Sequence, residues 1–72
     1  MLTVSKIKIL LNGEEKLIAS KTSIKNLIEG LDLDATKIAI EKNYEIIMPE
    51  DFAQIFLAEN DQIEIVHFIG GG

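Results

Sequence analysis

The chain ends in three consecutive glycines at positions 70–72, which follow directly on a segment with the pattern of a β-strand. In that segment Ile63 and Ile65 alternate with polar residues, as in a strand that buries one face. Glycines bury no side chain and lose the most backbone entropy on ordering, so they do not extend a packed strand. The sequence therefore predicts a final strand that continues into a flexible tail at 69–72, thin enough to enter a channel that any Cβ would block.

Two interpretations of this tail are open from the residues alone. It could be a frayed end or a linker with no role of its own, because chain termini are often disordered. It could instead present the α-carboxylate of Gly72 to a partner protein, with Gly70 and Gly71 passing through the partner's channel. The glycines join the strand segment without the Ser, Thr or Lys of a typical linker, which favours the second interpretation.

Length and composition limit what the rest of the chain can be. Its 72 residues make one domain, 1–72, with an ordered core expected at about 5–68. The absence of cysteine excludes disulfides, thiolate metal sites and a cysteine nucleophile. The N-terminus lacks the apolar core of a signal peptide, and no apolar run approaches the ~20 residues that span a bilayer. We therefore expect a cytoplasmic protein with no membrane partner.

The charge balance narrows the choice of partners further. The net charge is −5, from 12 acidic against 7 basic residues. Nucleic acid is a poor partner for such a chain, because neutralising phosphates requires clustered basic residues. A protein with a basic docking surface fits better, and opposite charges would speed the encounter.

Alternating apolar residues predict a strand at 5–11 and a returning strand at 14–19. Asn12-Gly13 between them is the strongest two-residue hairpin signal, because both positions tolerate a positive φ. On the returning strand we expect Ile18 to face the core and Leu17 to be partly exposed.

A helix is predicted next, capped by Thr22 or Ser23. Gly30 is a natural residue for its C-cap. The expected buried stripe is spaced at i, i+3, i+4 and i+7 and consists of Ile24, Leu27, Ile28 and Leu31.

The second half of the chain predicts a strand at 37–42 with Ile38 and Ile40 inward, a turn, and a short strand at 45–48. Pro49 ends that strand, and a helical turn at 50–53 is anchored by Phe52. In the final strand Ile63 and Ile65 face inward. A helix across one face of a mixed sheet is an α+β, two-layer arrangement, the β-grasp (ubiquitin-like) roll. Either the strand after the helix or the last strand should run parallel to the first.

No catalytic or metal site is indicated. His67 is the only histidine, and the pattern brings no serine to it. The acidic residues cluster in turns without a histidine or cysteine beside them, and no phosphate-binding glycine loop occurs. We therefore expect a non-enzyme whose C-terminal carboxylate is a substrate.

Several segments carry a resemblance to a known family. They are the hairpin at 11–14 (LNGE), the helix start at 23–28 (SIKNLI), the strand at 37–41 (KIAIE) with Asn43, and above all the end at 61–72 (DQIEIVHFIGGG). The chain resembles the ThiS family, the bacterial sulfur carriers of thiamine (thiazole) biosynthesis, which are ubiquitin-like β-grasp proteins. The small subunits of molybdopterin synthase, by contrast, commonly have prolines before their glycines.

The resemblance implies a set of partners and roles. A ThiF-type adenylating enzyme, using ATP and Mg²⁺ that this chain does not itself bind, would adenylate Gly72. A sulfur-donating enzyme would then convert it to a thiocarboxylate, which thiazole synthase (ThiG) consumes. Gly70 and Gly71 would thread the partner's channel, and the free carrier is expected to be a monomer. The expected docking residues lie just before the glycines and are Glu64, Val66, Phe68 and Ile69.

The chain also departs from the family pattern. Tyr44 stands where the family often has glycine, which predicts a wider turn, and Met48-Pro49-Glu50 replaces a common proline–arginine pair. Two alternatives remain: a molybdopterin-type sulfur carrier, and a β-grasp interaction module whose glycines are passive.

Overall fold

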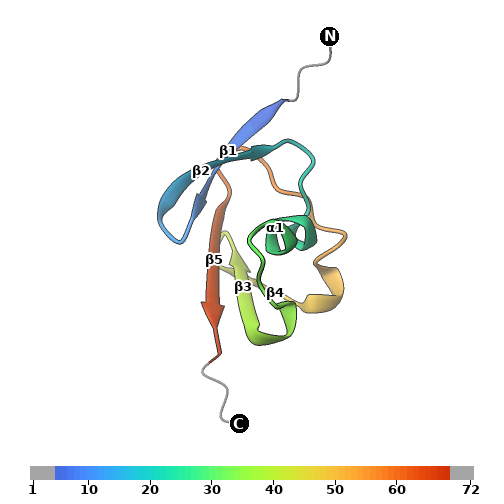
Figure 1. Cartoon of the computed structure of the whole chain (residues 1–72). Helices are drawn as coiled ribbons and strands as arrows, with labels where there is room; N and C mark the ends of the chain where they lie inside the picture. Colours follow the sequence, from blue (N-terminus) through green and yellow to red (C-terminus); the bar gives the residue numbers. More distant parts are fainter. Residues whose placement is uncertain (1–4, 69–72) are drawn as a thin grey trace.

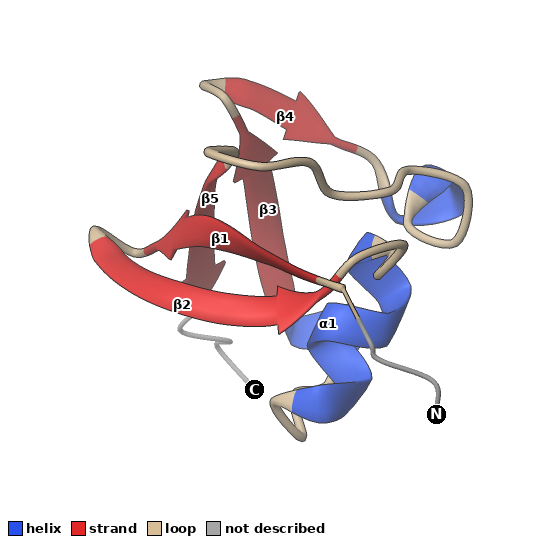
Figure 2. Cartoon of the chain, turned by 90° about the horizontal axis from the view of Figure 1, so that it is seen from above, coloured by secondary structure: helices blue, strands red, loops and turns tan. Residues whose placement is uncertain are grey.

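The computed structural model describes residues 5–68 of the chain. Five strands form one mixed sheet in the order β2-β1-β5-β3-β4, and helix α1 packs against one face of it (Figure 1). Figure 2 shows the two layers from above. This is the predicted α+β, two-layer β-grasp arrangement. The elements are β1 Lys6–Leu11, β2 Glu14–Ala19, α1 Ile24–Gly30, the 3-10 helix η1 Ala35–Lys37, β3 Ile38–Lys42, β4 Glu45–Ile47, the 3-10 helix η2 Pro49–Asp51 and β5 Gln62–His67.

The last strand, β5, is the one that runs parallel to the first. It lies between β1 on one side and β3 on the other, and its pairing with β3 is antiparallel. The sequence left open whether the strand after the helix or the last strand runs parallel to the first. The structure shows that it is the last strand. The strand that leads to the glycines thus occupies the centre of the sheet.

The core lies between the sheet and α1, where the expected inward positions meet. Ile18 is buried while Leu17 is 66% exposed, as the alternation on β2 predicts. Phe52 anchors the η2 segment with only 5% of its surface exposed. The buried apolar residues are Ile9, Ile18, Ile24, Leu27, Ile28, Ile38, Ile40, Phe52, Leu57, Ile63 and Ile65.

The N-cap of α1 is one of the two residues predicted from the sequence, whereas its C-cap differs from the prediction. The Ser23 hydroxyl accepts a hydrogen bond from the Asn26 N–H at 3.0 Å, as an N-cap side chain does. Gly30 is the last helical residue rather than a cap, and Leu31 is the C-cap. The left-handed position after it, at φ +59°, is taken by Asp32. Asp32 closes the helix because its N–H donates to the Glu29 carbonyl at 3.0 Å, while the next N–H donates to Ile28 at 3.1 Å.

This end of the helix gives a stability prediction. Gly30→Ala should raise the free energy of unfolding by about 0.5–1 kcal/mol, because Gly30 has helical backbone and an added Cβ would meet no atom within 4 Å. Gly13→Ala is the matched control with the opposite sign, since Gly13 sits at φ +84°. Chemical denaturation of both variants measures the effect. A Gly30→Ala protein less stable than the parent would contradict this account.

The turn between β3 and β4 corrects a second expectation. Lys42 pairs directly with Glu45, so the loop holds only two residues and the turn is tight rather than wide. Asn43 and Tyr44 have φ of +51° and +70°, the left-handed values that a tight two-residue hairpin requires. The Tyr44 hydroxyl donates to Gln62 Oε1 at 2.7 Å, and the Asn43 amide donates to Asp61 Oδ1 at 3.0 Å. These bonds tie the turn to the start of β5, which holds it tight without glycine.

Two strand boundaries also differ from the prediction. Lys37 belongs to η1 rather than to β3, because the Asp34 carboxylate accepts from the Thr36 N–H at 2.9 Å and caps a short 3-10 helix there. The Thr36 N–H and the Thr36 hydroxyl both donate to the Asp34 carboxylate. These two bonds, the hydroxyl bond first, lower the pKa of that exposed carboxyl. Met48 lies outside β4, which ends at Ile47.

Candidate functional site

The strand that leads to the glycines is held firmly at its start. Leu10 and Leu11 of β1 pair with Gln62 and Ile63 of β5. Where β1 ends, Asn12 continues the contact: its N–H donates to the Ile63 carbonyl at 2.8 Å. Its side-chain Oδ1 accepts from the Ile65 N–H at 2.7 Å. The first hairpin therefore fixes the position of the strand that presents the C-terminus.

The opposite edge of β5 is paired along its whole length. β3 pairs antiparallel with β5 from Lys42↔Ile63 to Ile38↔His67. One further bond follows, from the Phe68 N–H to the Lys37 carbonyl at 2.9 Å. Hydrogen bonds to this side therefore continue through Phe68, the last residue that the structure describes.

Three of the four expected docking residues are placed by the structure. Glu64, Val66 and Phe68 are exposed, and the last two expose 56% and 58% of their surface. The predicted facing of this strand is confirmed, whereas its role in docking stays a prediction. Ile69 and the tail residues Gly70, Gly71 and Gly72 lie outside the described residues.

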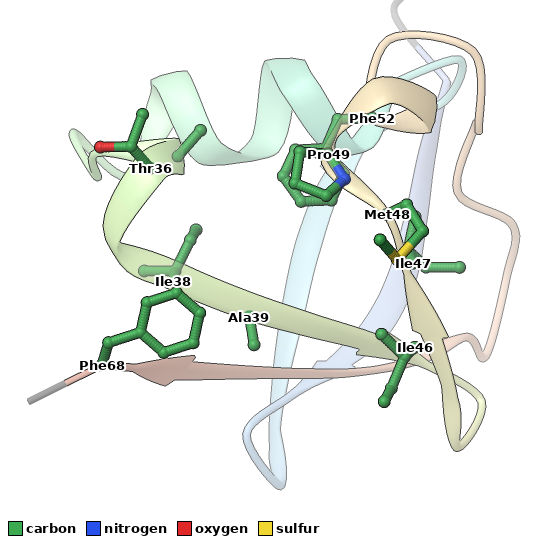
Figure 3. Close-up of a pocket in the computed structure, with 10 residues that line it drawn as sticks. Thr36, Ile38, Ala39, Ile46, Ile47, Met48, Pro49, Phe52 and Phe68 are labelled. Carbon is green, nitrogen blue, oxygen red and sulfur yellow. The ribbon is translucent and has the colours of Figure 1, made fainter.

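An apolar groove of about 360 Å³ lies beside β3 (Figure 3). It exists because β4 pairs only with Ile40–Lys42 and leaves the edge of Ile38 and Ala39 uncovered. The chain then passes into η2 at Pro49, which has no N–H with which to extend the ladder. Phe68 lies at one end of the groove and Ile46 at the other. The other lining residues are Ala35, Thr36, Ile38, Ala39, Ile47, Met48, Pro49 and Phe52.

The sequence did not lead us to expect Ile46 and Met48 as surface residues of a site. In the structure they expose 70% and 53% of their surface and line the groove. The signal was the run Ile46-Ile47-Met48, which holds more adjacent apolar side chains than the one buried face of a strand can take. Such a run in a three-residue edge strand leaves apolar surface exposed. The exposed apolar surface around Phe68 is therefore wider than β5 alone.

The charges on this side of the sheet are acidic. Glu41 of β3 lies directly opposite Glu64 of β5 in the antiparallel register. Like charges directly opposite each other across a strand pair repel, so this arrangement favours a basic group from outside the sheet. Within residues 5–68 the one ion pair is Lys8–Glu15, at 3.6 Å on the β1–β2 hairpin, far along the sheet from His67.

Catalytic groups do not gather here. His67 is exposed at the end of β5, and its strand partner is Ile38. Among the described residues no group of three or more histidines and carboxylates could hold a metal ion. In the same part of the chain, no helix has the length and apolar character needed to span a membrane. What the arrangement can do is present the end of a strand, flanked by apolar and acidic side chains.

The model of the ThiS family matches residues 8–72, which includes the terminal glycines. The chain is 38% identical over 66 residues to a protein named thiazole synthase from Paramagnetospirillum magneticum, covering 92% of this chain and 20% of that protein. A second thiazole synthase, from Magnetococcus marinus, is 41% identical over the same coverage. The chain thus spans about a fifth of the length of these relatives.

Other relatives match along nearly their whole length. The sulfur carrier protein ThiS of Bacillus subtilis is 38% identical over 63 residues, covering 86% of this chain and 96% of that protein. Among solved structures, the crystal structure of the thiamine biosynthesis protein ThiS from Geobacter metallireducens superposes with a TM-score of 0.81. Its sequence is 25% identical, and the match covers 92% of this chain and all of that one.

Proposed function

This chain belongs to the ThiS family, and we propose that it is a sulfur carrier protein of thiamine biosynthesis whose Gly72 carboxylate bears the sulfur. The observation that carries the proposal is the extent of the family match, which runs through the last glycine at 72. The folded part supports it: the central strand β5 is bonded along one edge as far as Phe68, four residues before Gly72 in the sequence.

The chemistry follows from the weakness of a carboxylate as an electrophile. An activating enzyme of the ThiF type transfers AMP from ATP to the Gly72 carboxylate, forming a mixed anhydride and releasing pyrophosphate. Hydrosulfide supplied by a donor enzyme then attacks the acyl carbon of the mixed anhydride. The bond from that carbon to the AMP oxygen breaks, AMP leaves, and the thiocarboxylate forms with loss of one proton. Mg²⁺ belongs to the ATP in the activating enzyme, where it neutralises phosphate charge. We propose that the carrier acts in the cytoplasm, where ATP for these steps is available.

Thiazole synthase is the proposed acceptor of the sulfur. Two relatives named thiazole synthase contain a segment similar to this whole domain within a much longer protein. Joining two domains in one polypeptide raises their effective concentration, which is useful when the two act together. The fused relatives therefore support thiazole synthase as the partner of this chain as well.

The test is to incubate the chain with Mg-ATP, an activating enzyme and a sulfur donor, and then to measure its intact mass. We expect a mass gain that corresponds to one oxygen replaced by sulfur, on a C-terminal peptide. No gain, with an activating enzyme shown to be active on its own carrier, would overturn the sulfur-carrier proposal in favour of a passive interaction module.

A surface prediction concerns Phe68, which lies four residues before the carboxylate and borders the apolar groove. Phe68→Ala should weaken binding to the activating enzyme by about 1–3 kcal/mol, the range for truncating an aromatic anchor. The fold should survive, because the side chain is 58% exposed.

Phe56 provides the matched control, since it is 56% exposed but belongs to the loop before β5. Titration calorimetry on both alanine variants, with a thermal melt of each, separates binding from folding. Equal affinities for the two variants would remove Phe68 from the docking surface. If Phe68→Ala instead unfolds the chain, the residue belongs to the core.

A further inference from the structure

β5 is longer than the stretch that its neighbour β1 covers. β1 ends at Leu11, opposite Ile63, and Asn12 adds one backbone and one side-chain bond beyond it. Within residues 5–68, no strand lies beside Ile65–His67 on this side. Figure 1 shows β5 continuing past the β1–β2 hairpin with β3 along its other edge.

The register identifies which backbone groups face this open edge. The N–H of Phe68 and the carbonyl of Gln62 bond to the β3 side, so even-numbered residues of the strand point that way. Odd-numbered residues point toward β1: the Ile63 carbonyl accepts from Asn12, and the Ile65 N–H donates to it. The next groups in this series are the carbonyl of Ile65 and both the N–H and the carbonyl of His67. They form a short open ladder immediately before the tail.

The other two edges of the sheet are protected against strand pairing. β2 carries the charged run Glu14, Glu15 and Lys16, and charged edge strands resist pairing. β4 is only three residues long and is followed by Pro49. The open segment of β5 consists of Ile65, Val66 and His67. It contains no acidic residue, lysine or proline that would hinder pairing with another strand.

We propose that thiazole synthase binds this domain by adding an extended strand of its own to the open edge of β5 at Ile65–His67. The inference rests on the proposed function and identifies the surface that thiazole synthase binds. Main-chain bonds of this kind supply affinity without requiring a deep pocket, and the adjacent side chains supply specificity. Val66 offers an exposed apolar contact on one face of the added strand.

Thiazole synthase is the occupant because its relatives carry this domain in the same polypeptide, and because the edge leads directly into the segment that must enter its active site. A strand paired at His67 fixes both the position and the direction of the tail. The five residues from 68 to 72 extend about 17 Å at 3.3–3.6 Å each. The paired strand should therefore lie no more than about 17 Å from the reacting sulfur.

Hydrogen exchange of individual amides tests this directly. In the free protein the His67 N–H should exchange quickly, while the Phe68 N–H is protected by its bond to Lys37. On adding thiazole synthase the His67 amide should become protected by at least about tenfold. Unchanged exchange of the His67 amide in a complex that forms would overturn the proposal. Protection by the activating enzyme with none by thiazole synthase would overturn it too.

A backbone variant provides the second measurement. His67→Pro removes the N–H on the open edge and leaves every bond to β3 in place, and proline is tolerated where a strand's N–H faces solvent. It should weaken binding to thiazole synthase about tenfold, as expected for one lost interface hydrogen bond. His67→Ala keeps the N–H and should bind within about twofold of the parent. Equal binding of the proline variant and the parent would contradict strand addition.

The mass of each protein after incubation with ATP, the activating enzyme and the sulfur donor separates this inference from the proposed function. A parent chain that gains no sulfur refutes the carrier proposal whatever the exchange data show. A chain that gains sulfur normally, yet binds thiazole synthase equally well with proline at 67, refutes only the strand addition. Thermal melts confirm that the variants compared are folded.

Discussion

Extending the chain by two residues beyond Gly72 should abolish adenylation. The proposed reaction takes place at the terminal carboxylate, and an added residue converts that carboxylate into a peptide bond with no oxygen free to attack ATP. The new terminus would also lie about 7 Å beyond the position the active site holds, at 3.3–3.6 Å per residue. ATP–pyrophosphate exchange with the activating enzyme measures the loss, and we expect no exchange above the enzyme's background.

The control places the same two residues before Met1. Because β1 and β5 are parallel, Lys6 at the start of β1 lies at the opposite end of the sheet from His67. This variant should support exchange at the rate of the parent. Near-normal exchange by the C-terminally extended chain would mean that the glycine end is not the substrate, and the passive-module interpretation would replace the carrier.

The residues predicted much of the fold because local patterns determine most of the burial. Alternation with period two placed Ile18, Ile40 and Ile63 inward, and the sheet buries all three. A strand with one buried face has only one register that satisfies its apolar residues. The same rule predicted that Val66 would be exposed, which made β5 recognisable as a candidate docking strand.

Two of the errors occurred where a residue other than glycine takes a left-handed backbone conformation that glycine usually adopts. Gly30 was expected to cap α1, but Asp32 adopts the left-handed conformation instead and leaves the glycine inside the helix. Tyr44 likewise takes a left-handed position in a tight turn, supported by Gln62, which is eighteen residues away. Short polar residues tolerate this conformation, and tertiary bonds can hold a larger one there. A local sequence pattern cannot predict such bonds, because their partners are distant in the chain.

Only one part of the candidate site, the glycine end, could be predicted from the sequence. The glycine end is a local feature and was evident at once. The open edge of β5 and the groove beside Phe68 depend on where strands distant in the chain stop pairing: β1 ends against Ile63, and β4 ends against Ile40. Such endpoints are set by long-range register, with partners about fifty residues apart in the first case. Only the structure shows that both gaps flank the same exit from the sheet.

Gly71→Val should lower the rate of adenylation about 100-fold while leaving the fold intact. A valine adds a branched Cβ to the segment proposed to thread the partner's channel, and it narrows the backbone conformations available there. A clash in that channel would displace the carboxylate from ATP, and positioning errors of this kind can cost about 100-fold in rate. The substitution lies four residues beyond the end of β5, so stability should change by less than about 0.5 kcal/mol.

A graded series distinguishes steric exclusion from a general effect of substitution. Gly71→Ala adds a single carbon and should fall between the parent and Gly71→Val in pyrophosphate exchange, because the clash grows with side-chain size. Gly30→Ala, in α1, should leave exchange unchanged and serves as the control for a glycine replaced elsewhere. Thermal midpoints are measured for all three variants. If valine and alanine at 71 both support exchange at the parental rate, no narrow channel receives this segment, and the free carboxylate alone would remain as the feature that the activating enzyme recognises.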